Sequence, residues 1–203
     1  MLSIIMKDEH INNAIKAYPN LRILKQDFDQ TLLSFIMSSV KNIASIRKSI
    51  RLLNQKFGKV INVDGIKFYL FPSTETLSEV SLNKLLETRI GFRAKHLKTS
   101  AKKLIEFSAS NNLKELSSDA VHKTLKSFPG VGDKVADCVM IFSLGFDSIT
   151  PLDVWGKRVL TNFYNLDPKM KYTEMKAWLD QYFQGYAGWA GQFLFEYIRN
   201  KNY

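Results

Sequence analysis

The sequence predicts an all-α fold of about ten helices. Apolar residues recur every three or four positions in nearly every segment, which is the period of a helix with one buried face. Hydrophobic residues make up 45% of the 203 residues and are spread along the whole length, so the chain can bury a sizeable core. No internal repeat, low-complexity tract or linker interrupts them, and we expect residues 1–203 to form a single globular unit.

The periodic segments predict helices along the chain, in order. They cover 29–39, 42–57, 82–90, 94–108, 113–127, 133–144, 154–164, 172–184 and 187–200. Asp29 stands near the start of the first of these helices as a plausible cap. Residues 59–71 are β-prone but interrupted by Asp64-Gly65, which predicts a loop or a short pair of strands. Breaks are expected at Asn111-Asn112, Pro129-Gly130, Gly145 through Pro151 and Asp167-Pro168.

The net charge and the cysteine content limit the classes of protein to which the chain can belong. The net charge is +10, and such a field attracts polyanions, with nucleic acid as the first candidate. A single cysteine excludes an intrachain disulfide and an iron–sulfur cluster held by four thiolates, and it fits a reducing compartment. The three histidines lie far apart and form no metal-ligand spacing. No apolar run reaches the roughly 18 residues of a membrane span.

Lysines follow one face of the helix predicted over 94–108. Lys95, Lys98 and Lys102 lie on that face, Arg93 precedes it, and no acidic residue occurs from Thr88 to Ile105. By itself this stripe fits a solvated helix face and a phosphate-contacting surface equally well.

The stretch KSFPGVGDKVADCV, residues 126–139, predicts a helix–hairpin–helix. One helix ends at Phe128, the turn Pro129-Gly130-Val131-Gly132 follows, and a second helix starts near Asp133. The glycines permit positive φ and the close approach of another backbone. The second helix begins with unpaired N–H groups and the positive end of its dipole, where a phosphate fits without base-specific contacts. An ordinary tight helical hairpin shares the turn, but the residues after it and the basic, all-α chain favour DNA binding.

Two side chains that follow this turn in the sequence suggest chemistry. Lys134 lies in the first turn of the second helix, where the dipole disfavours a cation and so favours the neutral amine. A neutral amine is a nucleophile that can form a Schiff base, whereas an ordinary surface lysine would contact phosphate. Asp153 is expected to cap a later helix, which leaves one carboxylate oxygen to stabilise a cationic sugar and help the lysine lose its proton.

Several motifs together resemble a known family. PGVGDKVADCV (129–139), PLDVW (151–155) and YAGWAGQFLF (186–195) are similar to the helix–hairpin–helix DNA glycosylases, specifically the 8-oxoguanine DNA glycosylase/AP lyases. LLSFIMSSVKNIASI (32–46) and IGFRAKHL (90–97) fit the same family. The resemblance implies two helical lobes with the active site in the cleft between them. One lobe would hold the hairpin, at about 113–144, and the N-terminal and C-terminal helices would pack as the second.

The resemblance also implies a reaction. The damaged base is flipped out of the duplex into a pocket. Lys134 attacks C1′ of the deoxyribose and expels the base, and the Schiff base then undergoes β-elimination, which nicks the strand 3′ to the site. Asp153 would orient the reaction and stabilise developing positive charge.

By the same resemblance, Cys138 and Phe195 pack on the two faces of the flipped base, and Phe142 lines the pocket. Cys138 lies one helical turn after Lys134, and Phe142 follows another turn on. The apolar pattern alone would assign Cys138, Phe142 and Phe195 to the core.

Other residues would contact DNA besides the turn at 129–132. Phe92 matches the side chain that wedges into the vacated base stack, and Arg93 matches the one that reaches the estranged base. Trp155 replaces a histidine that usually contacts phosphate.

Departures from the family pattern put the lesion range in doubt. Val40 replaces an asparagine that reads the opposite cytosine, so we expect weak discrimination of the opposite base. Gly191 stands where a glutamine binds the base edge, and Gln192, one residue on, is the candidate to compensate. Eukaryotic members carry an N-terminal β-rich domain, whereas only a short segment precedes the matching region here, so we expect this lesion to be recognised by other means.

Two alternatives remain open. A glycosylase of the same fold could act on another base, such as an alkylated purine, although Lys134 argues against the monofunctional alkylation enzymes, which use aspartate alone. The single cysteine excludes the endonuclease III type, which carries a four-cysteine cluster. The second alternative is a non-catalytic helix–hairpin–helix DNA-binding protein, which would need neither Lys134 nor Asp153.

The expected partner is double-stranded DNA with a damaged base, bound by a monomer because one flipped nucleotide needs one pocket. No cofactor and no metal site are expected, apart from an optional monovalent cation at the hairpin carbonyls that the resemblance implies. The short, acidic N-terminus favours a prokaryotic, cytoplasmic protein, associated with the nucleoid through its substrate and not with a membrane.

Overall fold

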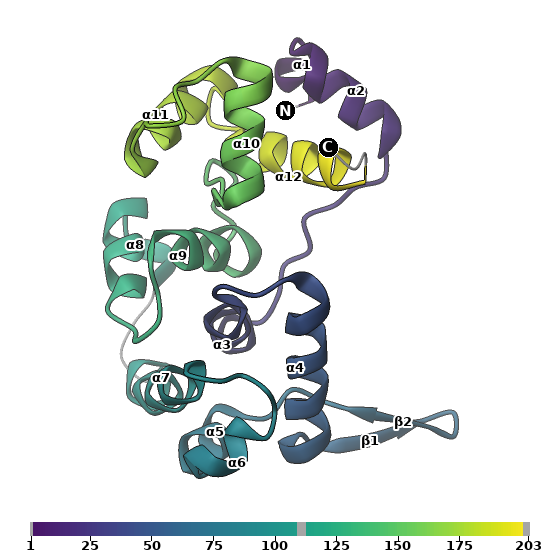
Figure 1. Cartoon of the computed structure of the whole chain (residues 1–203), viewed down its shortest axis with the longest axis vertical. Coiled ribbons are helices and arrows are strands. Elements are labelled where there is room, and N and C mark those ends of the chain that lie inside the picture. Colours follow the sequence, from purple (N-terminus) through teal and green to yellow (C-terminus); the bar gives the residue numbers. More distant parts are fainter. Residues whose placement is uncertain (1, 109–112, 201–203) are drawn as a thin grey trace. The chain divides into compact units, whose positions relative to one another are not determined.

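A computed structural model describes residues 2–108 and 113–200 of the chain, which divides into two compact units. Unit 1 joins Met1–Lys25 with Met140–Tyr203, and unit 2 is the continuous segment Gln26–Val139. Helices make up nearly all of the secondary structure in both units (Figure 1). The all-α fold class predicted from the apolar period is therefore confirmed.

Unit 2 is a helical body with one small β-hairpin. Its elements are α3 (Phe28–Ser38), α4 (Ile43–Phe57), β1 (Val60–Val63), β2 (Ile66–Tyr69), α5 (Thr74–Glu79), α6 (Leu82–Leu86), α7 (Arg93–Ser108), η1 (Leu113–Glu115), α8 (Ser118–Lys126) and α9 (Asp133–Val139). Helix α7 packs against α3 and α5, and α3 packs in turn against α9. Because Leu97, Ala101 and Leu104 on α7 are fully buried, this helix forms the centre of the unit and supports the elements on both sides.

Unit 1 combines the two ends of the chain. Its elements are α1 (Leu2–Ile5), α2 (Glu9–Ala17), the π-helical segment η2 (Met140–Leu144), α10 (Val154–Tyr164), α11 (Tyr172–Phe183) and α12 (Ala187–Arg199). Helix α12 packs against α2, α10 and α11, and its inward face contributes Phe193, Leu194 and Ile198 to the core.

A carboxylate at the start of α2 ties the N-terminal segment to the C-terminal helices. Asp8 Oδ1 accepts a hydrogen bond from the N–H of Ile11 at 2.8 Å and caps α2. The hydroxyls of Tyr164 and Tyr182 donate to the two oxygens of Asp8 at 3.1 and 2.9 Å. Burial, followed by the charge of Asp8, raises the pKa of Tyr164, so this phenol remains a donor.

Most predicted helices agree with the observed ones to within a residue or two. The helices predicted over 42–57, 154–164 and 187–200 begin and end within one residue of α4, α10 and α12. The cap of α3 is corrected. Asp27, not Asp29, accepts the N–H of Gln30 at 2.9 Å, while Asp29 accepts a hydrogen bond from Thr74 at 2.7 Å.

Two predicted helices are shorter than expected. The helix predicted over 82–90 ends at Leu86, because Arg89 and Gly91 both adopt left-handed backbone with φ of 62°. The helix predicted over 113–127 splits, because Ser117 caps a new helix that begins at Ser118. The predicted break at Asn111-Asn112 lies outside the described residues.

Helices α1, α2 and α5 were not predicted. Helices α1 and α5 have four and six residues, too few to display a period. In α2 the signal was present, since Ile11, Ala14 and Ile15 are buried at helical spacing.

The helix predicted over 133–144 changes type part of the way along. Helix α9 ends at Val139, and Met140–Leu144 is π-helical. A π turn holds more residues than an α turn, so a spacing of four across it no longer places two side chains on one face.

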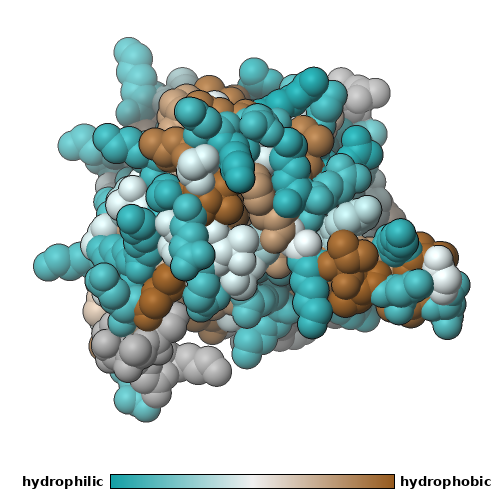
Figure 2. All heavy atoms as spheres, turned by 90° about the horizontal axis from the view of Figure 1, so that it is seen from below, coloured by the Kyte–Doolittle hydropathy of each residue, from teal (hydrophilic) through white to brown (hydrophobic). Residues whose placement is uncertain are grey.

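The segment at 59–71 is confirmed as a pair of strands. Strands β1 and β2 are antiparallel, with Val60 opposite Tyr69 and Val63 opposite Ile66. Side chains alternate between the two faces of a hairpin, and one face here consists entirely of apolar residues, namely Ile61, Val63, Ile66 and Phe68. Figure 2 shows hydrophobic atoms gathered on this projecting hairpin.

Candidate active site

The predicted hairpin is built on α7. Helix α8 ends at Lys126, a turn follows, and α9 begins at Asp133. Gly130 has φ of +83°, and a Cβ added there would lie 2.9 Å from the side chain of His96. Ser100 on α7 donates to the carbonyl of Pro129 at 3.0 Å. The glycine is therefore required twice, for its backbone conformation and for the close approach of α7.

Pairs of ionisable side chains connect the two helices of the hairpin. Lys126 Nζ lies 2.5 Å from Asp133 Oδ1, and His122 Nε2 lies 3.4 Å from Asp137 Oδ1. Asp137 is completely buried, which sequence reasoning did not anticipate. These contacts fix where α9 begins relative to α8.

Lys134 lies in the first turn of α9, as predicted, and is half-buried. Its Nζ lies 5.0 Å from the centroid of the Phe35 ring on α3. No acidic side chain among the described residues forms a salt bridge with it. An amine that no carboxylate holds in an ion pair can reach an electrophile once it has lost its proton. Phe35 was missed as a site residue because its spacing places it in the apolar stripe of α3.

The remaining turn residues and Cys138 also belong to unit 2. Val131 is buried and Gly132 is exposed, so the turn presents backbone at Gly132 and packs its valine inward. Cys138 is 3% exposed and lies one α-helical turn after Lys134. This burial is compatible with a core residue and with a pocket wall.

Asp153 caps α10, as predicted. Its Oδ1 accepts the N–H of Gly156 at 2.9 Å. Oδ2 accepts no hydrogen bond from the described residues and Asp153 is half-buried, so one oxygen of the carboxylate is available. Trp155, two residues on, is 37% exposed, and the guanidinium of Arg158 lies 5.2 Å from its ring.

The other predicted pocket residues lie in unit 1. Phe142 belongs to η2 and is half-buried, as are Gln192 and Phe195 on α12. A Cβ on Gly191 would lie 2.5 Å from the side chain of Thr150, so this position has no room for a glutamine unless Thr150 moves. The Oγ1 of Thr150 is buried without a hydrogen-bond partner among the described residues.

The two predicted DNA-contact residues at the start of α7 differ sharply in exposure. Phe92 is 64% exposed, whereas Arg93 is 6% exposed. The guanidinium of Arg93 donates to the carbonyls of Ser39, Val40 and Ile90. Arg93 is thus occupied by backbone oxygens in this structure.

The lysine stripe on α7 is divided. Lys95 and Lys102 are exposed, whereas Lys98 donates to the carbonyl of Val80 at 2.7 Å. Lys98 therefore holds the end of α5, and only the exposed lysines fit a phosphate-facing surface.

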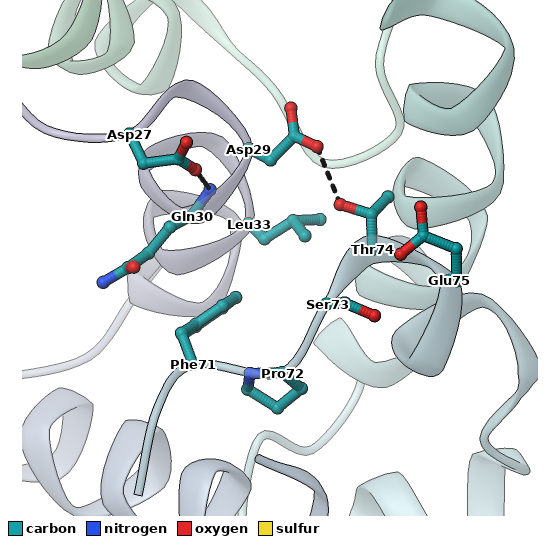
Figure 3. A pocket seen from close by; sticks show the side chains of 9 residues that line it. All are labelled: Asp27, Asp29, Gln30, Leu33, Phe71, Pro72, Ser73, Thr74 and Glu75. Atoms are coloured by element: carbon teal, nitrogen blue, oxygen red, sulfur yellow. Dashed lines mark hydrogen bonds between the residues drawn. The ribbon is translucent and has the colours of Figure 1, made fainter. Parts of the chain in front are cut away.

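An acidic pocket of about 300 Å³ lies at the starts of α3 and α5 in unit 2, and it contains no predicted site residue. It is lined by Asp27, Asp29, Gln30, Leu33, Phe71, Pro72, Ser73, Thr74 and Glu75. Figure 3 shows the hydrogen bonds that bind Asp27 to Gln30 and Asp29 to Thr74 across it. Burial raises the pKa of Asp29, although its bond from Thr74 acts in the other direction. Both carboxylates stabilise helix starts: Asp27 caps α3, and Asp29 accepts a hydrogen bond from Thr74, the first residue of α5.

No three His, Cys, Asp or Glu side chains of the described segments converge in a way that would hold a metal ion. In the same segments, every helix is too short or too polar to cross a membrane.

The predicted site residues therefore fall into two sets. Lys134, Cys138, the turn at 129–132, Phe92 and Arg93 belong to unit 2. The second set, in unit 1, is Asp153, Trp155, Phe142, Gln192 and Phe195. The union of both sets in one pocket stays a prediction.

The fold and the hairpin define an all-α protein of the helix–hairpin–helix class. Residues 33–184 match the model of the HhH-GPD superfamily base excision DNA repair proteins. Because this match covers most of the sequence, the chain belongs to that superfamily.

Relatives of known name agree with this assignment. An N-glycosylase/DNA lyase of Saccharomyces cerevisiae is 32% identical over 86% of the chain. The structure of MBOgg1 with a low-affinity DNA ligand superposes with a TM-score of 0.91 at 36% identity, covering 98% of this chain and 69% of that one. The Clostridium acetobutylicum 8-oxoguanine glycosylase/lyase, bound to duplex DNA with cytosine opposite 8-oxoguanine, gives a TM-score of 0.90 at 32% identity, covering 100% and 71%.

The chain spans little more than half the length of the curated relatives that it matches. It covers 56% of the yeast protein and 55% of an N-glycosylase/DNA lyase OGG1 of Arabidopsis thaliana.

Proposed function

We propose that this chain is a bifunctional base-excision-repair enzyme, a DNA glycosylase and AP lyase that removes 8-oxoguanine from duplex DNA. The observation that carries the proposal is the position of Lys134 in the first turn of α9, directly after the hairpin, on the ring of Phe35 and without a carboxylate partner in the described residues. Superfamily membership and the names of the relatives support the same activity.

Lys134 would act as the nucleophile. Its Nζ lone pair forms a bond to C1′ of the damaged nucleotide while the bond from C1′ to the base breaks, and the base leaves with its electron pair and takes up a proton. Opening of the sugar ring gives the protonated imine. Loss of a C2′ proton then breaks the bond from C3′ to its oxygen, and the strand is nicked 3′ to the site.

Asp153 would stabilise the positive charge that develops on the sugar. Its Oδ1 is fixed by the N–H of Gly156, which orients the carboxylate, and Oδ2 would be left for the charge on the sugar. Because a capped carboxylate needs no reorganisation, it can act at the moment the charge forms.

DNA would be held by the hairpin and by exposed cations. The N–H groups at the start of α9 suit a phosphate. The carbonyl oxygens of Phe128 and Pro129 each accept one hydrogen bond from the described residues. Because a carbonyl oxygen has two lone pairs, each of them keeps one lone pair for the optional monovalent cation. We further propose that the chain acts as a monomer in the cytoplasm of a prokaryote.

Borohydride trapping on a labelled duplex with 8-oxoguanine tests the proposal. We expect a covalent adduct with the parent chain and none with Lys134→Gln, since an amide cannot form the imine. Lys169→Gln, on an exposed loop residue, serves as the matched control and should trap like the parent. No adduct with this duplex, nor with one that holds an abasic site, would refute the lyase.

A second candidate is a glycosylase of the same fold for another damaged base. The packing of Gly191 on Thr150 favours it, because the side chain that binds the base edge in the resembling family has no room here. Excision from a panel of oxidised and alkylated duplexes separates the two. Faster release of another base than of 8-oxoguanine would favour the second candidate.

A further inference from the structure

Val40 has an unusual backbone for its side chain. Its φ is +52°, in the left-handed region that β-branched residues rarely adopt, and its side chain is 93% exposed. An exposed valine gains nothing from packing here, so the surrounding structure must impose the conformation. Imposed left-handed backbone of this kind is found at functional sites.

The guanidinium of Arg93 holds this turn from behind. Its Nε donates to the carbonyl of Ser39 at 2.6 Å, and Nη2 donates to the carbonyls of Ser39 and Val40, the latter at 3.2 Å. Its Nη1 donates to the carbonyl of Ile90 at 3.2 Å. One buried cation therefore joins residues 39–40 to the chain just before α7.

A second cation makes the same connection. Lys41 Nζ donates to the carbonyl of Arg89 at 2.7 Å and to the hydroxyl of Ser49 at 2.6 Å. Burial, and then the nearby charge of Arg93, lower the pKa of Lys41. Two turns, 39–42 and 87–92, are thus bound together by two cations on backbone carbonyls.

Phe92 lies beside the first cation. The Cζ of Arg93 is 4.3 Å from the centroid of the Phe92 ring, and Phe92 is 64% exposed. The same guanidinium contacts the ring of one exposed apolar residue and the carbonyl of the other. Two apolar side chains therefore project from adjacent turns that share one support.

Charge indicates what these side chains meet. No acidic residue occurs from Gln30 to Val63 or from Thr88 to Ile105. These segments contain the whole of the first turn and all of the second except Glu87, whose carboxylate pairs with Lys56. The exposed cations of the segments include Arg47, Lys48 and Lys95. An apolar projection in a field of this sign fits a polyanion with an apolar interior, which is a base-paired duplex.

The family resemblance already implies that Phe92 is a wedge. We propose that Arg93 and Lys41 form a clamp that positions Phe92 for this role, and that Val40, on the adjacent turn, is a second apolar side chain presented to the base stack of duplex DNA. Arg93 is then a positioning residue, because four of the five donor hydrogens of its guanidinium are directed to backbone carbonyls. This role differs from the contact with the estranged base that the family resemblance implied. The inference rests on the proposed glycosylase function.

The rate of excision with different bases opposite the lesion shows whether Arg93 positions the turn or reads the opposite base. Single-turnover excision of 8-oxoguanine is measured with each of the four bases opposite, for the parent, Arg93→Met and Val40→Gly. We expect Arg93→Met to slow excision by about 10–100-fold, because misplacement of a positioning group by about 1 Å has effects of this size. The factor should be the same for all four bases. A loss confined to one opposite base would make Arg93 a base reader and overturn the clamp.

A double variant tests whether Arg93 acts through Val40. If it does, Arg93→Met with Val40→Gly should be no slower than Arg93→Met alone, whereas multiplied losses would show independent roles. Lys98→Met is the matched control, since Lys98 is also a cation on α7 that donates to a carbonyl, away from both turns. It should excise at the parent rate. Val40→Gly leaves the buried network intact and keeps the test valid if Arg93→Met does not fold.

Two further readouts distinguish this inference from the proposed function. Cleavage of a preformed abasic site in single-stranded DNA needs no wedge, so Arg93→Met should retain it within about twofold. If the parent cleaves nothing, the proposed function fails and the wedge is tested by fluorescence of 2-aminopurine opposite a stable abasic analogue. The parent should increase the signal and Arg93→Met should not; an unchanged signal with the parent overturns the wedge.

Discussion

Two turns of unit 2 contain a left-handed residue next to a helix, and they achieve it by opposite means. At the hairpin, Gly130 has φ of +83°, which glycine adopts without steric cost. At 39–42, Val40 has φ of +52°, which valine resists. The first turn is encoded by its own residues, whereas the second is imposed by Arg93, more than fifty positions away. A backbone conformation can thus be supplied locally or from a distance, and only the local kind is visible in sequence.

The largest effect on stability is expected from removing the distant support. Arg93→Met leaves the carbonyls of Ser39, Val40 and Ile90 without their donor, in a place where the guanidinium is 6% exposed. We expect a loss of about 2–4 kcal/mol in the free energy of unfolding. Urea denaturation of the whole chain, parent against variant, measures it. A loss below 0.5 kcal/mol would mean that water replaces the guanidinium and that the turn does not depend on it.

The second largest loss of stability is expected at the hairpin turn, whose left-handed residue is Gly130. Gly130→Ala meets both the positive φ and the side chain of His96 at 2.9 Å, and we expect a loss of about 1–3 kcal/mol. Gly132→Ala is the control within the same turn, because a Cβ there meets nothing within 4 Å. Equal losses at both positions in thermal unfolding would contradict the assignment of the strain to Gly130.

Replacing Val40 by a residue that adopts left-handed backbone more readily should stabilise the protein. Asparagine tolerates left-handed backbone better than valine, so Val40→Asn should raise the free energy of unfolding by about 0.5–1 kcal/mol. Val40→Ala retains a side chain that disfavours this region and is the comparison for the asparagine. If alanine stabilises as much as asparagine, the gain comes from β-branching alone.

The smallest effect is expected at Asp29, whose hydrogen bond from Thr74 supports a helix start and not a left-handed turn. Burial raises the pKa of Asp29, so the folded state binds more protons than the unfolded state above the ordinary pKa, and stability falls as pH rises through this window. Asp29→Asn should therefore raise Tm at pH 7 by an amount worth less than about 1 kcal/mol. The gain should vanish near pH 3, where the carboxyl is neutral in both states. A lower Tm at pH 7 would show that the charge itself is needed.

Sequence predicted the parts of the fold that depend on local signals. The apolar period located α3, α4, α7 and α10 to α12, and the Pro-Gly pair located the hairpin. It gave no signal for the early end of α6, because the left-handed backbone at Arg89 is supported by Lys41. The π-helical turn after Val139 is likewise invisible to a period of 3.6.

The candidate site divides in the same way. The cap at Asp153 and the place of Lys134 follow from residue type and helix position, and the structure agrees with both. The ring of Phe35 under the lysine could not be predicted, because α3 and α9 meet only through tertiary packing. The buried state of Arg93 was missed for the same reason.

The discontinuity of unit 1 has a consequence for synthesis on the ribosome. Asp8 receives hydrogen bonds from Tyr164 and Tyr182, and α2 packs on α12, so the first helices have no partners until the last ones emerge. At about 5–20 residues per second, translation of the intervening unit 2 takes roughly 6–25 s. During that time the N-terminal helices remain without the partners that complete unit 1. A messenger truncated before the codons of α12 would therefore yield a chain in which α2, α10 and α11 lack the helix that they share as a packing partner.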